Sequence, residues 1–105
     1  LETLRKHADI WFFSGRSETV RYETCLWFHL NTTFKMDQFA TNPEWLTLRP
    51  KKHFVEDHLL KRDWLWGMRD VDRERLVAVF EDRQRVVDMW RENDVTCFQV
   101  AAGDY

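Results

Sequence analysis

The chain has 105 residues, of which 44% are hydrophobic and 15% aromatic, and its formal net charge at pH 7 is -2. This length supports one hydrophobic core, and therefore one domain over residues 1–105, but it is short for an enzyme domain. The charge excludes a global basic field that attracts nucleic acid, and the absence of an apolar run near the roughly 18 residues of a spanning helix argues against a membrane segment.

The first half of the chain begins with a charged segment and continues with a strand and a helix. Residues 1–7 read as the tail of a longer helix, so we expect an excised piece of a larger protein. Ile10 to Phe13 form an apolar run that predicts a strand buried on both faces, and Gly15 behind it allows a tight turn. Ser17 can cap a helix that runs to about Asn31. Its packed face is predicted to contain Val20, Thr24, Trp27 and Phe28.

The second half continues this alternation of strands and helices, which predicts an α/β fold with a parallel sheet and right-handed crossovers. Leu76 to Phe80 predicts a second buried strand, and the helix behind it should turn Val86, Val87 and Trp90 inward. The other predicted elements are a loop or helical turn over 32–43, a strand over 45–48, a helix over 54–68, a charged connection over 70–75, a helix over 83–92 and a strand over 95–100.

Two cysteines, Cys25 and Cys97, lie among apolar neighbours in a predicted helix and a predicted strand. Such surroundings favour buried, reduced thiols over a disulfide or a metal pair. Reduced thiols are typical of a reducing cytosol.

Ser14-Gly15-Arg16 combines groups that can hold a phosphoryl group at the end of the first strand. The segment offers a hydroxyl, backbone N–H groups before a helix N-terminus and a guanidinium fork. An ordinary turn with a surface arginine is the alternative interpretation.

Glu81 and Asp82 stand where the second apolar run stops and a helix starts, which is where α/β enzymes keep their chemistry. Two carboxylates at a strand end can supply part of a Mg²⁺ site. Lys61 lies in the first half of the third predicted helix, and a lysine there is usually only solvated.

These motifs, with the runs at residues 82–91 and 95–105, resemble the haloacid-dehalogenase superfamily of aspartate-nucleophile phosphatases, most nearly the 3′-phosphatase domain of phage polynucleotide kinases. The resemblance implies a Rossmann-like fold with a parallel sheet flanked by helices. The resemblance implies that Ser14, Gly15 and Arg16 bind phosphate. It implies that Lys61 is catalytic and also binds phosphate. It further implies that Asp82, with Glu81, holds Mg²⁺. Arg49 and Asp57 become supporting residues, and Arg49 with Lys51 and Lys52 could form a local patch for a nucleic-acid end. The family has a pair of acids shortly before the lysine; Asp57 matches the first, and His58 stands in place of the second. The family also commonly has an Asp-Asp pair at the metal site, and Glu81 stands in place of its first Asp.

The nucleophile motif of that superfamily, Asp-x-Asp-Gly at the end of a first strand, is missing from the chain. Asp70-Val71-Asp72 does not replace it, because no apolar strand precedes it and Arg73 follows in place of glycine. We therefore expect the nucleophile strand to lie upstream or to have been lost. Without the nucleophile the chain alone should be inactive, and without its strand the exposed sheet edges should make the chain poorly stable or prone to self-association.

The resemblance implies a parent enzyme that removes phosphate from a DNA or RNA 3′ end through an aspartyl-phosphate, in nucleic-acid repair. The resemblance also implies a phage-encoded protein in the host cytoplasm. It does not decide whether a kinase domain lies upstream. Two alternatives remain: a related phosphatase of small phosphate esters, and a non-catalytic domain that binds a partner or nucleic acid.

Overall fold

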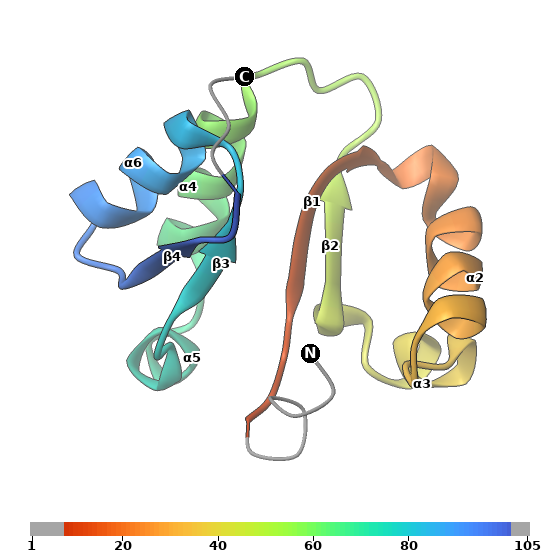
Figure 1. The fold of residues 1–105 in the computed structure, drawn as a ribbon. Coiled ribbons are helices and arrows are strands. Elements are labelled where there is room, and N and C mark those ends of the chain that lie inside the picture. Colours follow the sequence, from red (N-terminus) through yellow and green to blue (C-terminus); the bar gives the residue numbers. More distant parts are fainter. Residues whose placement is uncertain (1–7, 102–105) are drawn as a thin grey trace. The chain divides into compact units, whose positions relative to one another are not determined.

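The computed structural model describes residues 8–101, which divide into two compact units, one ending at His53 and the other beginning at Phe54. Each unit contains one pair of parallel strands together with helices (Figure 1). This confirms the predicted α/β class with parallel strands. The prediction of one domain over residues 1–105 stays a prediction, and the helix tail expected at residues 1–7 lies outside the described residues. No helix within residues 8–101 is long and apolar enough to cross a membrane.

The first unit joins two parallel strands through two helices. Phe12 of the first strand lies opposite Leu46 of the second, and Ser14 lies opposite Leu48. The helix predicted behind Ser17 is present, and the segment left as a loop or helical turn contains a short helix. The elements are β1 (Phe12–Ser17), a 3-10 helix (Glu18–Val20), α2 (Arg21–Asn31), α3 (Met36–Thr41), a second 3-10 helix (Pro43–Trp45) and β2 (Leu46–Arg49).

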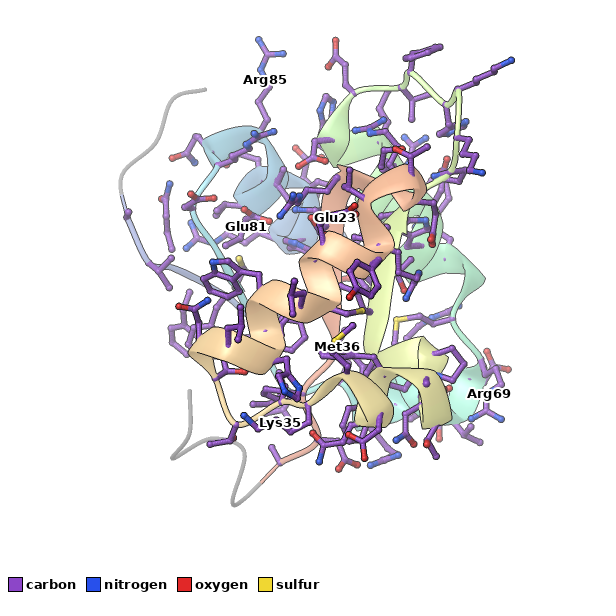
Figure 2. The ribbon with its side chains drawn as sticks, turned by 90° about the vertical axis from the view of Figure 1, so that its right-hand side faces the viewer. Glu23, Lys35, Met36, Arg69, Glu81 and Arg85 are labelled. Carbon is purple, nitrogen blue, oxygen red and sulfur yellow. The ribbon has the colours of Figure 1, made fainter. Side chains whose placement is uncertain are left out.

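Aromatic rings fill the core of this first unit. The ring centroids of Phe12 and Phe28 lie 4.5 Å apart, and those of Phe12 and Phe34 lie 5.2 Å apart. Lys35 leads the chain into α3 (Figure 2), and its ammonium donates 2.9 Å to the His29 carbonyl at the end of α2. The buried members of this core are Cys25, Phe34, Phe39, Leu46 and Leu48.

The predicted packed face of α2 is correct for Thr24 and wrong for Trp27. Thr24 is buried beside Cys25, whereas 54% of Trp27 is exposed. Trp27 instead lies edge-on against the ring of Phe28, with centroids 5.4 Å apart. One turn of helix thus presents Phe28 to the core and leaves its large neighbour at the surface.

β1 continues beyond the predicted strand and includes Ser14-Gly15-Arg16, so the tight turn expected at Gly15 is absent. The register shifts between Ser14, which lies opposite Leu48, and Ser17, which lies opposite Arg49. Gly15 and Arg16 are therefore extra residues on β1 with no opposite residue on β2. Such a bulge bends a strand and redirects its side chains without ending it.

The second unit places two helices beside a pair of short parallel strands. Val79 lies opposite Cys97, and Glu81 lies opposite Gln99. As predicted, the helix after the acid pair buries Val86, Val87 and Trp90. The elements are α4 (Asp57–Gly67), α5 (Asp70–Arg75), β3 (Val79–Glu81), α6 (Gln84–Glu92) and β4 (Cys97–Gln99).

Two predictions for the second unit are wrong. Residues 70–75 form the helix α5, not an irregular connection, because acids in its first turn and arginines in its last turn complement the helix dipole. The apolar run before Glu81 is not buried on both faces, since Val77 is 85% and Phe80 53% exposed. Phe80 stacks on Phe98 with ring centroids 5.5 Å apart. Exposed rings of this kind favour association, but self-association stays a prediction.

The prediction of buried, reduced cysteines is confirmed. Cys25 and Cys97 are both free and buried. Burial raises the pKa of each thiol, because an apolar environment disfavours the thiolate. Neither side chain is therefore a strong nucleophile at neutral pH.

Phe34 offers a direct test of the first core, because only 2% of it is exposed and four aromatic rings pack against it. We expect Phe34→Ala to lower the free energy of unfolding by about 3–5 kcal/mol, through lost burial and the cavity that remains. Chemical denaturation measures this loss. The control Tyr22→Ala, at a ring that is 65% exposed, should change stability by no more than about 0.5 kcal/mol. Equal losses in the two variants would contradict this core.

Candidate functional site

The phosphate segment, defined as Ser14-Gly15-Arg16, occupies the bulge at the end of β1. The backbone N–H of Arg16 donates to Oγ of Ser14 over 3.2 Å, which fixes the hydroxyl oxygen and leaves its proton able to point outward. The Arg16 side chain is exposed. A hydroxyl and a guanidinium two residues apart can both donate to the oxygens of one phosphoryl group.

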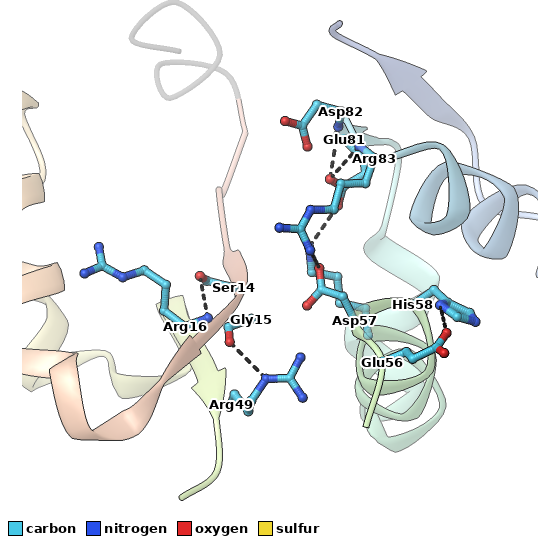
Figure 3. A network of polar contacts seen from close by, with 11 residues as sticks. Ser14, Gly15, Arg16, Arg49, Glu56, Asp57, His58, Glu81, Asp82 and Arg83 are labelled. Atoms are coloured by element: carbon cyan, nitrogen blue, oxygen red, sulfur yellow. Dashed lines mark hydrogen bonds and ion pairs between the residues drawn. The ribbon is translucent and has the colours of Figure 1, made fainter. Parts of the chain in front are cut away.

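Arg49 positions the phosphate segment from the end of β2. Its Nε donates to the Gly15 carbonyl over 3.0 Å (Figure 3). One terminal nitrogen of the same guanidinium donates to the His53 carbonyl over 3.2 Å. The sequence suggested Arg49 as part of a basic patch. In the structure its guanidinium holds two backbone carbonyls and so supports the bulge, while a contact with nucleic acid stays a prediction.

The chain behind the phosphate segment is also fixed. Ser17 caps the 3-10 helix by accepting a hydrogen bond from the Thr19 backbone over 3.1 Å. Arg21 makes two 2.7 Å hydrogen bonds to Glu18 and a further one of 2.8 Å to the Leu46 carbonyl on β2. The hydrogen bond from Arg21 lowers the pKa of the Glu18 carboxyl, so this support persists at neutral pH. The phosphate segment is thus anchored to β2 on both sides.

Lys61 is the central group of the second unit's candidate site. Only 7% of it is exposed, and its ammonium lies 2.9 Å from Glu81 Oε2 and 3.3 Å from Asp57 Oδ2. Asp57 is one helical turn before it on α4, and Glu81 ends β3. Burial between two carboxylates separates this residue from an ordinary solvated lysine, because such a charge is stable only when it is paired.

Glu81 holds both Lys61 and the loop that follows β3. Its Oε1 accepts hydrogen bonds from the backbone N–H of Asp82 at 3.0 Å and of Arg83 at 3.3 Å, while Oε2 receives Lys61. The side chain is only 10% exposed. Its two oxygens therefore already have partners that set the conformation of the acid pair.

Arg83 is a member of this network that sequence reasoning did not identify. Its guanidinium lies 3.4 Å from Asp57, which also pairs with Lys61 (Figure 3). His58 stands where the family has a second acid, and its Nδ1 lies 3.4 Å from a carboxylate oxygen of Glu56. The only sequence signal for Arg83 was its place directly behind the acid pair.

The carboxylates at the end of β3 fit a Mg²⁺ ion in part. Glu81 is engaged by Lys61 and the loop, so Asp82 is the better candidate for a ligand, and its carbonyl is fixed by Gln99 Nε2 at 3.2 Å. Residues 8–101 contain no group of three or more His, Cys, Asp or Glu side chains placed to hold a metal. Mg²⁺ often uses one or two carboxylates and takes its other ligands from water and substrate phosphate, so a single aspartate is compatible with such a site.

The excluded acid pair, Asp70 and Asp72, lies on α5 and not at the end of a strand. Asp72 pairs with Arg69 at 2.8 Å. This arrangement agrees with the exclusion of both residues from the reactive site.

One comparison with known proteins gives a match. A family model described as the polynucleotide kinase PNKP phosphatase domain matches residues 1–105. The comparisons with curated proteins and with solved structures found no match. The family match spans both the phosphate segment and the Lys61 network.

Replacing Lys61 tests whether the buried charges depend on one another. Lys61→Met leaves the carboxylates of Asp57 and Glu81 without their shared ammonium, so we expect a loss of about 3–5 kcal/mol in the free energy of unfolding. Chemical denaturation measures it. Adding Glu81→Gln should recover part of the loss, because it removes one unpaired charge.

The matched control is Arg85→Met on α6, where the side chain is 73% exposed (Figure 2) and pairs with Glu56 at 3.6 Å. A pair of this kind contributes at most about 1 kcal/mol. A loss at Lys61→Met no larger than that of the control would show that the ammonium is solvated.

Proposed function

Since the chain belongs to the family of polynucleotide kinase phosphatase domains, within the haloacid-dehalogenase superfamily, we propose that it is the phosphate-binding and metal-binding part of a polynucleotide 3′-phosphatase. The observation that carries this proposal is the buried Lys61, held at the end of β3 by Glu81 over 2.9 Å. Lysine is almost never buried unless its charge is paired, so a lysine held between two carboxylates at a strand terminus supports a role for that charge.

The chain's own donors would bind the phosphoryl group. Ser14 offers a hydroxyl, Arg16 an exposed guanidinium and Lys61 an ammonium whose position is set by two carboxylates. Charged donors held in fixed positions stabilise the negative charge of phosphoryl oxygens during transfer.

In the proposed reaction an aspartate carboxylate outside the 105 residues attacks phosphorus, and the bond to the 3′-oxygen breaks. A second aspartate protonates that oxygen, and then removes a proton from the water that cleaves the aspartyl-phosphate to inorganic phosphate. Both aspartates belong to the Asp-x-Asp-Gly motif that this sequence lacks. The chain therefore supplies binding groups and not the nucleophile.

Asp82 would hold Mg²⁺ in this proposal. The ion, when bound, supplies positive charge to a phosphoryl oxygen. Glu81 acts indirectly, since its oxygens hold Lys61 and the backbone of Asp82 and Arg83.

A nucleic-acid 3′ end is the proposed substrate, and DNA and RNA both remain candidates. The net charge of -2 gives no general attraction, so local lysines such as Lys51 and Lys52, both exposed, would contact the phosphate backbone. Removal of a 3′-phosphate heals a broken end, and the buried, reduced thiols suit a reducing cytosol such as that of a phage-infected host.

Arg16 gives the first test of this function. We expect the chain to bind a 3′-phosphorylated oligonucleotide more tightly than the same strand with a 3′-hydroxyl, and Arg16→Ala to weaken only the first complex, by about tenfold, which is the strength of one charged hydrogen bond. Fluorescence anisotropy with labelled strands measures both affinities. The surface variant Arg85→Ala should bind like the wild type, and a weakening of both complexes by Arg16→Ala would count against a phosphate site.

Turnover gives the second test. We expect the 105-residue chain alone to release no phosphate from a 3′-phosphorylated oligonucleotide or from phenyl phosphate, because it lacks the nucleophile motif. A colorimetric phosphate assay with and without Mg²⁺ measures this. If the chain releases phosphate and Asp82→Asn abolishes that release, the proposal that the nucleophile lies outside these 105 residues is overturned. Release from phenyl phosphate but not from the oligonucleotide would favour small phosphate esters as substrates.

A further inference from the structure

A hollow of about 310 Å³ is lined by β1, β2 and α2, so all of its lining residues belong to the first unit. This volume is at the lower end of the usual range for ligand pockets, about 300–1,000 Å³, and suits one nucleotide better than a longer segment. We call it the Trp27 hollow. Its lining includes Phe12, Ser14, Arg16, Trp27, Phe28 and Leu46.

The spacing of residues on β1 brings the phosphate segment to this hollow. Phe12 of β1 packs against Phe28 of α2, with ring centroids 4.5 Å apart. Side chains two positions apart on a strand lie on the same face of the sheet, so Ser14 faces α2 as Phe12 does. Figure 3 shows the Ser14 hydroxyl and the Arg16 side chain on the same side of β1. The phosphate segment therefore supplies polar groups to the lining of the hollow.

Trp27 forms an apolar wall of the hollow that the fold uses only in part. Its ring lies edge-on to that of Phe28, with centroids 5.4 Å apart and an angle of 85° between the planes. This contact holds the indole in place, yet 54% of Trp27 is exposed. A large aromatic surface beside a concave apolar site with a few polar groups is typical of a place where a ligand binds.

The two kinds of lining residue suit the two parts of a nucleotide. The Ser14 hydroxyl, fixed by the Arg16 backbone N–H at 3.2 Å, and the exposed Arg16 guanidinium favour a negatively charged group. The rings of Trp27, Phe28 and Phe12 favour an uncharged, flat group. A nucleotide that carries a 3′-phosphate joins both groups through its sugar, whereas a phosphate ester without a ring engages only the polar residues.

We propose that the base of the 3′-terminal nucleotide enters the Trp27 hollow and stacks on Trp27. This inference rests on the proposed function, in which Ser14 and Arg16 hold the 3′-phosphate. Stacking on an aromatic side chain tolerates any sequence, because every base has a π-face. A base can stack on Trp27 only when it leaves its neighbours in the strand, so the ligand class is a 3′ end whose last base is unpaired.

Substitutions at Trp27 test the stacking. We expect Trp27→Ala to weaken binding of a single-stranded 3′-phosphorylated oligonucleotide by about tenfold, the effect of losing one base–aromatic stack. Trp27→Leu should weaken it to a similar degree, because leucine keeps an apolar side chain without a ring, and Trp27→Phe should weaken it less. Tyr22→Ala, at a ring on the same helix that is 65% exposed, is the matched control and should bind like the wild type.

A change of ligand tests the stacking without altering the protein. A 3′-phosphorylated strand with an abasic terminal nucleotide should bind the wild type about tenfold more weakly than the intact strand does. Trp27→Leu should bind the intact and the abasic strand equally, since the partner of the base is already gone. Arg16→Ala should reduce the salt dependence of binding, whereas Trp27→Leu should leave that dependence unchanged.

The outcomes distinguish this inference from the proposed function. If the wild type does not prefer a 3′-phosphate over a 3′-hydroxyl, the proposed function fails and this inference with it. If the preference exists but the wild type binds intact and abasic strands equally, the inference alone is overturned. The same holds if Trp27→Leu loses affinity equally for both strands, because the indole then acts on the fold and not on the base.

Discussion

The second unit depends on one buried ammonium, that of Lys61, placed between the carboxylates of Glu81 and Asp57 at 2.9 and 3.3 Å. Removing a charge from water is costly, and only close partners of opposite sign offset that cost. The three side chains come from α4 and from the end of β3, so their pairing fixes the helix against the strand terminus. The same contacts hold the Lys61 ammonium in one position at the end of β3.

Glu81 shows how a glutamate can fit a position at which the family commonly has the shorter aspartate. Its extra methylene group lets one oxygen reach Lys61 while the other turns back to the N–H groups of Asp82 and Arg83. A shorter side chain has less reach for both contacts. Glu81 therefore organises the loop after β3, and in the proposed function the metal falls to Asp82.

Sequence patterns predicted the alternation of strands and helices, since the inward residues Val86, Val87 and Trp90 repeat at helical spacing. They failed where partners distant in sequence decide the outcome. The bulge at Gly15 depends on how β1 pairs with Arg49 of β2. The residues around Gly15 alone carry no information about that pairing, and they predicted only a tight turn. Lys61 was picked out by resemblance alone, because its burial arises from Glu81, twenty positions later in the chain.

The separation of the parallel pairs into different units has a consequence for folding. β1 pairs with β2 inside the first unit, and β3 pairs with β4 inside the second. Each of these strand pairs can therefore form without a strand from the other unit. Parallel pairing is slow because the chain between the strands must be ordered first. During synthesis the first unit can complete its sheet while the second is still emerging. The two parts of the candidate site would then become protected from hydrogen exchange independently of each other.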